Sequence, residues 1–580
     1  MNFMLNKLNF LLSKKQRGSL IYITILLFFG MVLEIFGLGV IVPMLTFILE
    51  PDSLGQFLKN STFIKNIGIT NQSNFLYFFL IGIVLLYVIK TIVIIYLVYK
   101  QNRFITDLYS DFSVNLFNSY INQNYSFHLN KNSSILVKNI QVEVNLFRSF
   151  LSSWITIVIE TSLLLAIMLT LIFIEPIGAL SIGLFFSILS IVMFSISKKK
   201  LKSWGKKREV IDSSISKHIL ETFGGIKDIL ILGRKNYFEK YFFKVSRERS
   251  RILKNYLTIS QTPRYFFELV AIFGLVGFIF IMILIGKDNT ELISILGVFV
   301  AATFRMIPSF NRIFSAFQNA KYYTSSVDLM YKEFKSFYRN QTENNYIKSK
   351  DFNSKIEIRN LTFSYSKSKD LVLKKINLTI NKGDSIGIIG ESGSGKSTLV
   401  DLLMGLYKPK DGKIMIDGVD IHNNTRNWQN KIGYVPQSIF LTDDSILKNI
   451  ALGIDENLID FELINSVVKA SQLEKFIHSL DEGINTQVGE RGVQLSGGQL
   501  QRIGIARALY NQPEILILDE ATASLDYNTE INVMEAIKNI KKDKTLIIVA
   551  HRLTTLDDCD YIYKIEKGEL NLKNQKYAEQ

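Results

Sequence analysis

The sequence predicts a chain in two parts: an α-helical domain that crosses a membrane, followed by an α/β domain. Six apolar runs, each long enough to cross a bilayer, which requires roughly 20 residues, all lie before residue 313. Further on, the segment 390–397 reads GESGSGKS and stands between an apolar, strand-like run at 385–389 and a helix-like run at 398–404. We therefore expect a transmembrane domain at 1–325, a linker at 326–354 and a second domain at 355–580.

The six apolar runs set the topology of the first domain. They cover about 19–49, 75–98, 151–174, 177–198, 265–286 and 291–312. Four basic residues (Lys7, Lys14, Lys15 and Arg17) precede the first run and place the N-terminus in the cytosol by the positive-inside rule. We expect no cleavable signal peptide, because the first run is too long and lacks a small-residue cleavage site.

The connections between the runs differ in character. Short external turns are expected at Glu175–Pro176 and Lys287–Thr290, whereas the polar stretches at about 99–150 and 199–264 must lie in the cytosol and have helical periodicity. The first external connection, about 50–74, carries apolar residues at near-helical spacing. Both an amphipathic helix on the outer membrane face and a disordered loop fit this segment.

The composition excludes other classes of function. The net charge is +15, which Lys and Arg in cytoplasmic loops explain. A nucleic-acid partner is not expected, because no recognition module or repeat of basic and aromatic residues is present. The single cysteine, Cys559, rules out an intrachain disulfide and fits a reducing, cytosolic environment.

The segment GESGSGKS has the pattern GxxxxGK[ST] in the context that a phosphate-binding loop requires. Backbone N–H groups of such a loop point at phosphate, and the dipole of the following helix adds positive potential. Lys396 should reach the β- and γ-phosphates of ATP, and the Ser397 hydroxyl should ligate Mg²⁺. The residues expected to bind the nucleotide here are Gly390, Glu391, Ser392, Gly393, Ser394, Gly395, Lys396, Ser397 and Thr398.

A second apolar run supplies the acidic side chains that the same site needs. Residues 515–520 read ILILDE, which predicts a buried parallel strand that ends in Asp519. Asp519 is placed to hold Mg²⁺, directly or through water. Glu520, just beyond the strand, is placed to accept a proton from an attacking water molecule.

The region from about 355 to 570 resembles the ATP-binding cassette (ABC) ATPases. LSGGQ at 495–499 is similar to the signature motif of that family, VPQS contains a glutamine like its Q-loop residue, and VAHR contains a histidine like its switch histidine. SLD at 524–526 looks like the D-loop, and Glu490 lies in a stretch that exporters use to contact the opposite subunit. No catalytic position is degenerate, so ATP hydrolysis is expected.

The resemblance implies a role for each matching residue. Gln437 would sense Mg²⁺ and contact the transport domain, His551 would contact the γ-phosphate, and Tyr365 would stack on adenine. The signature residues would close over the nucleotide held by the other subunit; they are Ser496, Gly497, Gly498 and Gln499. One chain has one loop and one signature, so it needs a partner, either a second copy of itself or a paralogue.

The whole chain resembles type IV ABC exporters. The implied fold is an α-helical transmembrane domain, with six spans and long cytoplasmic extensions, joined to an α/β P-loop ABC ATPase domain. In this class, short helices at the ends of the extensions dock on the ATPase domain. The stretches Asn122–Ser134 and Glu221–Asp228 are the candidates for these helices.

Four basic residues lie in or beside the spans at one depth. Arg305 is 14 residues into the sixth run, which places it about 21 Å from the outer end at a rise of about 1.5 Å per residue. Lys90, Arg264 and Arg312 lie at a similar depth, where charged side chains are costly and mark cavities or pathways. A simpler role also fits Arg264 and Arg312, because long basic side chains near the interface can extend into it, and Arg264 can pair with Glu268 four residues on. Lys90 and Arg305 lie too deep to reach the interface easily, and the intramembrane residues Glu34 and Glu160 can be their partners.

Local sequence narrows the expected cargo. Residues 304–313, 262–265, 87–90 and 224–234 look like the corresponding stretches of PglK-type lipid-linked oligosaccharide flippases. Lys90 departs from the expected Arg, which keeps the charge but loses bidentate phosphate geometry. The resemblance implies a homodimer in the bacterial cytoplasmic (inner) membrane that binds membrane lipid and moves a polyprenyl-pyrophosphate-linked oligosaccharide. An exporter of another amphiphile (lipid, peptide or drug) is the alternative, and a membrane-anchored regulatory ATPase is a third hypothesis.

Overall fold

The computed structural model describes residues 2–40, 72–174, 176–285, 289–340, 352–365, 370–521, 530–531, 544–550 and 553–575. The chain divides into two compact units. The first comprises Met1–Gln123 and Phe127–Gln341, and the second comprises Asn124–Ser126 and Thr342–Gln580. Each unit is described by itself below.

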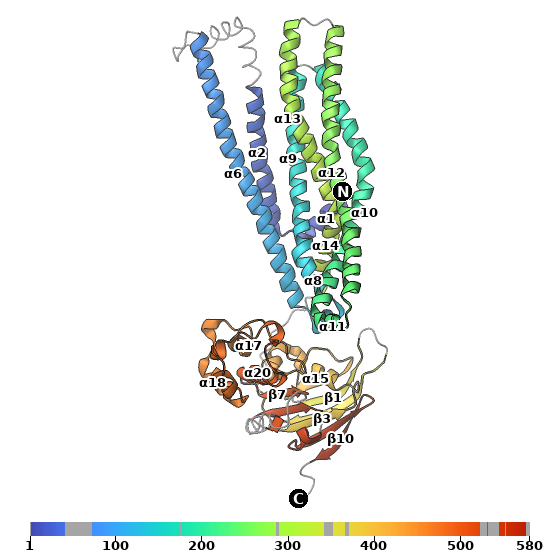
Figure 1. The fold of residues 1–580 in the computed structure, drawn as a ribbon, viewed down its shortest axis with the longest axis vertical. Helices are drawn as coiled ribbons and strands as arrows, with labels where there is room; N and C mark the ends of the chain where they lie inside the picture. The colour runs from blue at the N-terminus through green and yellow to red at the C-terminus, as the bar shows by residue number, and fades with distance from the viewer. Residues whose placement is uncertain are drawn as a thin grey trace. The chain divides into compact units, whose positions relative to one another are not determined.

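The described part of the first unit is entirely helical. Six long helices run alongside one another (Figure 1). Their bounds are α2 (Lys14–Gly39), α6 (Gln72–Ile121), α9 (Val144–Ile174), α10 (Pro176–Gly224), α12 (Lys235–Ile285) and α13 (Asn289–Tyr322). Each contains one of the six apolar runs or the described part of it, so the expected helical domain is confirmed. Within the described residues, three stretches are long and apolar enough to cross a membrane: Lys14–Gly37, Phe75–Ile121 and Ser133–Phe173.

Three of these helices continue far beyond their apolar runs. Helices α6, α10 and α12 have 50, 49 and 51 residues, or about 75 Å each, against a hydrocarbon core of about 30 Å. The polar stretches at 99–121, 199–224 and 235–264 are therefore continuations of membrane helices. This agrees with their helical periodicity.

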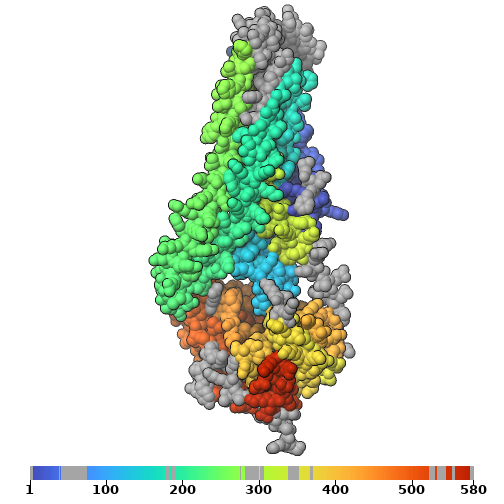
Figure 2. Space-filling model, turned by 90° about the vertical axis from the view of Figure 1, so that its right-hand side faces the viewer, coloured from blue at the N-terminus to red at the C-terminus, as the bar shows by residue number. Residues whose placement is uncertain are grey.

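Shorter helices complete the unit. They are α1 (Asn2–Leu11), α7 (Tyr125–Asn130), α8 (Ser133–Lys138), the π-helical turn η1 (Asn139–Glu143), α11 (Ile226–Ile231) and α14 (Thr324–Asn340). Helix α7 falls within the first stretch expected to dock on the ATPase domain, α11 overlaps the end of the second, and the docking stays a prediction. Figure 2 shows α10 on one face of the unit, with α12 on one side of it and α14 on the other.

The helical extensions have a hydrophobic core of their own. Phe112 and Leu116 of α6, Phe147 and Phe150 of α9, and Met330 of α14 are buried in one cluster. Each buried side chain of this size contributes about 1.5–3 kcal/mol relative to the exposed state. This core fixes α14 against α6 and α9, although residues 326–340 belong to the linker expected from the sequence.

The second unit contains two sheets. An antiparallel sheet has the order β2–β1–β4–β5, and a mostly parallel sheet has the order β10–β9–β3–β8–β7–β6, in which only β10 is antiparallel to its neighbour. The strands are β1 (Lys355–Phe363), β2 (Leu373–Asn381), β3 (Ser385–Gly390), β4 (Asp411–Ile416), β5 (Val419–Asp420), β6 (Ile432–Val435), β7 (Ile515–Asp519), β8 (Thr545–Val549), β9 (Tyr561–Glu566) and β10 (Glu569–Gln575).

Alternating side chains of the parallel sheet supply two cores. Ile515 and Ile517 of β7 join a cluster with residues of the antiparallel sheet, whereas Leu516 and Leu518 join a cluster under the helices. A strand that is buried on both faces has a continuous apolar run as its sequence. The run ILIL at 515–518 therefore predicts β7. The helices are α15 (Lys396–Leu403), α16 (Thr425–Gln429), α17 (Ile446–Ile450), α18 (Phe461–Ala470), α19 (Glu474–His478) and α20 (Gly497–Tyr510). The expected α/β architecture is confirmed.

Some expectations concern residues outside the described ranges. Residues 50–71 of the first external connection lie there, and residues 72–74 begin α6. Of the two short external turns, Glu175, Lys287 and Asp288 also lie there, whereas Pro176 begins α10 and Asn289 begins α13.

Candidate functional site

The loop Gly390–Ser397 connects the end of β3 to the start of α15. Gly395, the residue before α15, has φ of 111°, and Gly393 has φ of 80°, backbone conformations that other residues rarely adopt. A Cβ atom at Gly395 would lie 2.8 Å from Leu373 Cδ2, and one at Gly390 would lie 2.5 Å from Ile565 O. The tight turn at these positions therefore requires glycine, as the pattern GxxxxGKS predicts.

Lys396 lies under this loop with its side chain largely buried. Its ammonium group donates to Gly390 O at 2.8 Å and to Glu391 O at 3.0 Å. The buried Ser394 Oγ has no hydrogen-bond partner within the described residues. A buried hydroxyl without a hydrogen-bond partner is costly. An anion in the loop would accept a hydrogen bond from Ser394 Oγ and attract the Lys396 ammonium group. The loop therefore fits a phosphate chain.

Asp519 ends β7, two strands from β3 in the same sheet. Burial, followed by the neighbouring Glu520, raises the pKa of Asp519, although Lys396 and a hydrogen bond from Tyr434 act in the opposite direction. A nearby divalent cation would favour the charged form of this carboxylate. Ser397, Gln437 and Asp519 offer hydroxyl, amide and carboxylate oxygens, the ligand type that Mg²⁺ prefers.

Glu520 has an unusual backbone conformation, with φ of 50°. Its N–H donates to Val549 O at 2.9 Å, and its carboxylate accepts a hydrogen bond from Gln437 Nε2 at 2.6 Å. A non-glycine residue in this region is sparsely populated and persists where the surroundings fix it, often at functional sites. The structure thus brings together the expected Q-loop glutamine and the expected general base, which are 83 residues apart.

Tyr365 lies beside the start of α15. Its hydroxyl forms a hydrogen bond of 2.8 Å with Thr398 Oγ1. Its ring meets Phe363 and Tyr407 edge-on, with centroids 5.1 and 5.7 Å away, and 39% of the residue is exposed. Edge contacts leave surface on the ring faces for stacking. Tyr365 is thus close to the loop, as expected for the residue proposed to stack on adenine.

The signature segment opens α20 in an arrangement called a capping box. Ser496 Oγ accepts a hydrogen bond from Gln499 N at 3.3 Å, and Gln499 Oε1 accepts one from Ser496 N at 2.8 Å. The first N–H groups of the helix belong to Gly497 and Gly498, which lack side chains. Such a helix N-terminus favours anions, and these residues lie at the surface of the unit.

Two residues near the nucleotide loop were missed by sequence reasoning. Burial and the nearby Asp519 raise the pKa of Asp401 to about 6, and Tyr434 forms a hydrogen bond with Asp519. Asp401 lies on α15, where its position toward β7 is a result of helix packing. The only signal for Tyr434 was its place on the strand that leads to Gln437. His551 and Ser524–Asp526 lie outside the described residues.

The candidate substrate residues are placed in the first unit as follows. Lys90 Nζ lies 4.7 Å from the centroid of the Tyr87 ring, and the Tyr87 hydroxyl donates to Gly37 O of α2 at 3.0 Å. Arg264 Nε pairs with Glu268 Oε1 at 2.9 Å on the exposed surface of α12. The backbone of Arg305 lies in α13, and its side chain is outside the described set.

Arg312 pairs with Glu160 and lines a polar cavity. Its Nε lies 2.9 Å from Glu160 Oε1, and the Glu160 side chain is 10% exposed. The cavity has a volume of about 460 Å³ between α6, α9 and α13. Besides Arg312 it is lined by Arg148, a residue that sequence reasoning missed because it precedes the expected third span. A row of hydroxyl groups along α9 accompanies it: Ser149, Ser152, Ser153 and Thr156.

Comparison with known families gives two matches. The ABC transporter transmembrane region family matches residues 20–307, and the ABC transporter family matches residues 373–523. The second range contains the glycine loop, the signature segment and β7, so the comparison supports the expected ATPase domain.

Two relatives each align over less than two fifths of this chain. YgaD of Bacillus subtilis (strain 168), an ATP-binding/permease protein, is 42% identical over 227 residues, 39% of each chain. The alpha-hemolysin translocation ATP-binding protein HlyB of Proteus vulgaris is 45% identical over 221 residues, 38% of this chain and 31% of HlyB. The alignments thus span less than two fifths of the relatives' own length.

A solved structure matches both units. The structure of a bacterial Atm1-family ABC exporter with ATP bound superposes with a TM-score of 0.76, covering 96% of this chain and 94% of the exporter chain at 21% identity. At this identity the likeness establishes the fold: a helical ABC transmembrane region with an ABC ATPase domain.

Proposed function

This chain is an ABC transporter with a transmembrane region and an ATPase domain, and from this premise we propose that it is a homodimeric, ATP-driven flippase. The proposed cargo is a polyprenyl-pyrophosphate-linked oligosaccharide, moved across the bacterial cytoplasmic membrane. The observation that carries the proposal is the polar cavity with Arg148 and Arg312 at the cytoplasmic ends of the second, third and sixth expected spans.

The cavity suits a phosphate-bearing head group. Two guanidinium groups offer planar, charged donors that match phosphate oxygens, and the hydroxyl row on α9 supplies further donors. Arg148 Nε is buried without a hydrogen-bond partner in the described residues, so a bound anion would satisfy it. Glu160 neutralises part of the charge of Arg312. In this proposal, Lys90 and Arg305 continue the basic path into the membrane.

In the ATPase domain, each residue of the site has a task that its geometry suits. ATP bound in the loop would take over the hydrogen bonds that Lys396 now makes to Gly390 O and Glu391 O. Mg²⁺, held by Ser397, Asp519 and Gln437, would supply neutralisation of phosphate charge. Glu520 would accept the proton of the attacking water, oriented by the hydrogen bond from Gln437.

Two copies of the chain would complete two sites. The capped N-terminus of α20, with Ser496, Gly497 and Gly498, would close over the nucleotide held by the partner. ATP binding would bring the ATPase domains together, and hydrolysis with product release would separate them. The same cycle would move the transmembrane helices between two conformations. ATP would favour one conformation because it binds that conformation more tightly than the other.

The test is the ATPase activity of the purified protein in lipid nanodiscs, with and without a polyprenyl-pyrophosphate oligosaccharide. We expect stimulation by the glycolipid, none by a neutral phospholipid, and loss of the stimulation in Lys90→Ala/Arg305→Ala. The Glu520→Gln variant gives the background rate of ATP hydrolysis. Hydrolysis that is indifferent to the glycolipid would refute this cargo and favour another amphiphile. Hydrolysis without transport of any cargo in sealed vesicles would favour a membrane-anchored regulatory ATPase.

A further inference from the structure

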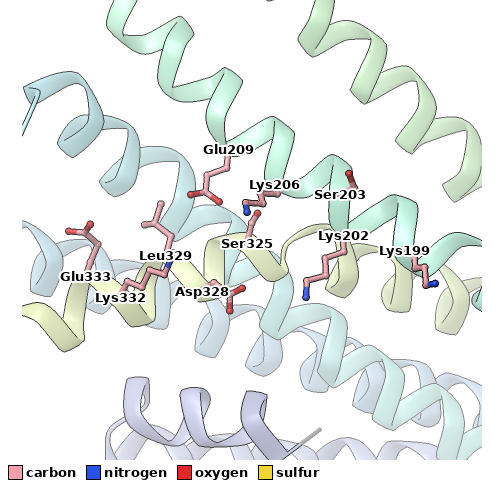
Figure 3. Close-up of a pocket in the computed structure, with 10 residues that line it drawn as sticks. All are labelled: Lys199, Lys202, Ser203, Lys206, Glu209, Ser325, Asp328, Leu329, Lys332 and Glu333. Carbon is pink, nitrogen blue, oxygen red and sulfur yellow. The ribbon is translucent and has the colours of Figure 1, made fainter.

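A second, larger cavity of the first unit lies between α10 and α14. It has a volume of about 740 Å³, and it shares none of its lining residues with the polar cavity around Arg312. Four lysines line it: Lys199, Lys202 and Lys206 from α10, and Lys332 from α14. Figure 3 shows Lys202 and Lys206 extending from α10 toward α14.

The three lysines of α10 share one face of the helix. Their spacing of three and four residues places them on adjacent turns of the same side. Consecutive like charges on one helix face repel one another, so this arrangement costs stability unless an anion lies among them. The other lysines of α10, at positions 198, 200, 207 and 217, do not line the cavity.

Two of the three acidic residues of the cavity wall have partners elsewhere. Asp328 pairs with Lys7 of α1 at 2.5 Å. Glu333 accepts two hydrogen bonds from Lys131, at 2.7 and 2.8 Å. In the part of the chain that the structure describes, none of the four lining lysines forms an ion pair. The cavity therefore keeps an excess of positive charge.

Two neighbouring groups respond to this local charge and burial. Burial, followed by the proximity of Lys202 and Lys198, lowers the pKa of Lys321. Glu209, the third acid of the wall, has a raised pKa, because it is partly buried and lies near Glu143, although nearby cations, Lys332 among them, act in the opposite direction. One carboxylate leaves most of the charge of four lysines uncompensated.

The position of the cavity along α10 sets its level in the membrane. Lys199 directly follows the expected fourth span, 177–198, and Lys206 lies seven residues further on, or about 10 Å toward the cytosol. The head-group layer on each side of a bilayer is about 5–7 Å thick. The upper end of the cavity thus coincides with the phosphates of the cytoplasmic leaflet.

We propose that this cavity, the lysine pocket, binds the phosphate of an anionic phospholipid from the cytoplasmic leaflet. The ligand chemistry is a phosphate anion held by several ammonium groups, and Leu329 adds an apolar contact in the wall. Basic residues just cytoplasmic of a span attract anionic lipids. Because Asp328 and Glu333 are already paired with lysines outside the pocket, the four pocket lysines concentrate positive charge at one place.

The experiment measures the acylation rate of each lysine by mass spectrometry, using the full-length protein in nanodiscs. Nanodiscs of phosphatidylcholine alone are compared with nanodiscs that contain rising fractions of phosphatidylglycerol. We expect the four pocket lysines to be protected by phosphatidylglycerol, whereas Lys200 and Lys207 keep their rate. Because this measurement uses the unaltered protein, its result does not depend on whether a variant folds.

A matched pair of variants tests the site. In Lys202→Gln/Lys206→Gln, the phosphatidylglycerol fraction needed to protect Lys199 and Lys332 should rise by roughly 25-fold, because the loss of each lysine weakens lipid binding about fivefold. Lys200→Gln/Lys207→Gln removes the same charge from the same helix and should shift it less than about twofold. Equal shifts in both variants would overturn the proposal in favour of a general surface attraction.

A third experiment tests whether a soluble anion occupies the lysine pocket. Inorganic phosphate is added to phosphatidylcholine nanodiscs, with chloride at the same ionic strength as the control. Protection by phosphate but not by phosphatidylglycerol would show a site for a soluble anion and would overturn the lipid assignment. Protection by neither would overturn the pocket as an anion site.

Discussion

Glu143 and Arg208 form a buried ion pair, with 3.2 Å between Glu143 Oε2 and Arg208 Nη2. The two residues are 65 positions apart, and the pair joins the π-helical turn before α9 to the extension of α10. Lys138 Nζ lies 3.2 Å from the other oxygen of Glu143, and Ser326 Oγ donates to Glu143 at 2.5 Å. Three separate segments are thus tied to one carboxylate.

Removing Arg208 should destabilise the helical extensions strongly. In Arg208→Met, the buried Glu143 carboxylate keeps its ion pair with Lys138 but loses the one with Arg208. Breaking a buried ion pair costs about 3–5 kcal/mol. Chemical unfolding of the full-length protein in detergent, followed by circular dichroism, measures this. Arg103→Gln is the control, because Arg103 and Asp107 form an ion pair in which both side chains are more than half exposed; a loss of about 0–1 kcal/mol is expected there. Equal losses would contradict the special role of the buried pair.

Replacement of Glu520 should stop hydrolysis and leave nucleotide binding intact. Glu520→Gln removes the proton acceptor, and general base catalysis contributes about 100- to 10,000-fold. The amide still accepts the hydrogen bond from Gln437. ATPase rate and ATP affinity, measured on the same preparation, check this. A rate within tenfold of the unaltered protein would show that another group accepts the proton.

The ring of Tyr365, not its hydroxyl, should matter for nucleotide affinity. Tyr365→Ala should weaken ATP binding by about 1–3 kcal/mol, the typical contribution of a base stacked on an aromatic ring. Tyr365→Phe removes only the hydrogen bond to Thr398 and should cost less than about 1.5 kcal/mol. Binding of a fluorescent ATP analogue measures both. An equal effect of the two variants would assign the role to the hydroxyl.

Asp401 should make the nucleotide-free protein less stable as the pH rises from about 4 to about 6. Burial and Asp519 raise its pKa to about 6, whereas an unfolded Asp titrates near 3.9. Between these values the folded state binds more protons than the unfolded state, so stability decreases with rising pH and is constant above 6. Asp401→Asn should therefore be more stable than the unaltered protein at pH 7 but not at pH 4.5. Thermal unfolding at both pH values tests this, and a stabilisation independent of pH would argue against titration of Asp401.

The pair between Arg312 and Glu160 complicates any test of Arg312 in transport. Arg312→Ala alone removes one cationic partner of the buried Glu160 carboxylate and should destabilise the protein. The double variant Arg312→Ala/Glu160→Gln removes both charges and should regain most of that stability. If Arg312 also binds the cargo, the double variant remains deficient in glycolipid-stimulated ATPase activity while its unfolding midpoint recovers. Recovery of both would show that the arginine is structural.

The local motifs were predictable because each depends on a few consecutive residues. GESGSGKS, ILILDE and LSGGQ specify their turn, strand and capped helix through the conformations of glycine, burial on both faces of a strand, and the Ser496–Gln499 capping box. The number of long helices and their extension past the membrane followed from apolar runs and helical periodicity. Arg264 and Glu268 were predictable partners, because their spacing of four places them on adjacent turns.

The contacts between distant segments were decided only by tertiary structure. Arg148 and Arg312 meet in one cavity, Gln437 meets Glu520, and Glu143 meets Arg208, because helices and strands far apart in the sequence pack side by side. Sequence periodicity gives the face on which a residue lies, but it does not give the partner element or the register between elements. The sequence by itself thus determined the chemistry available to this protein, and the packing of its helices and strands determined which of those groups act together.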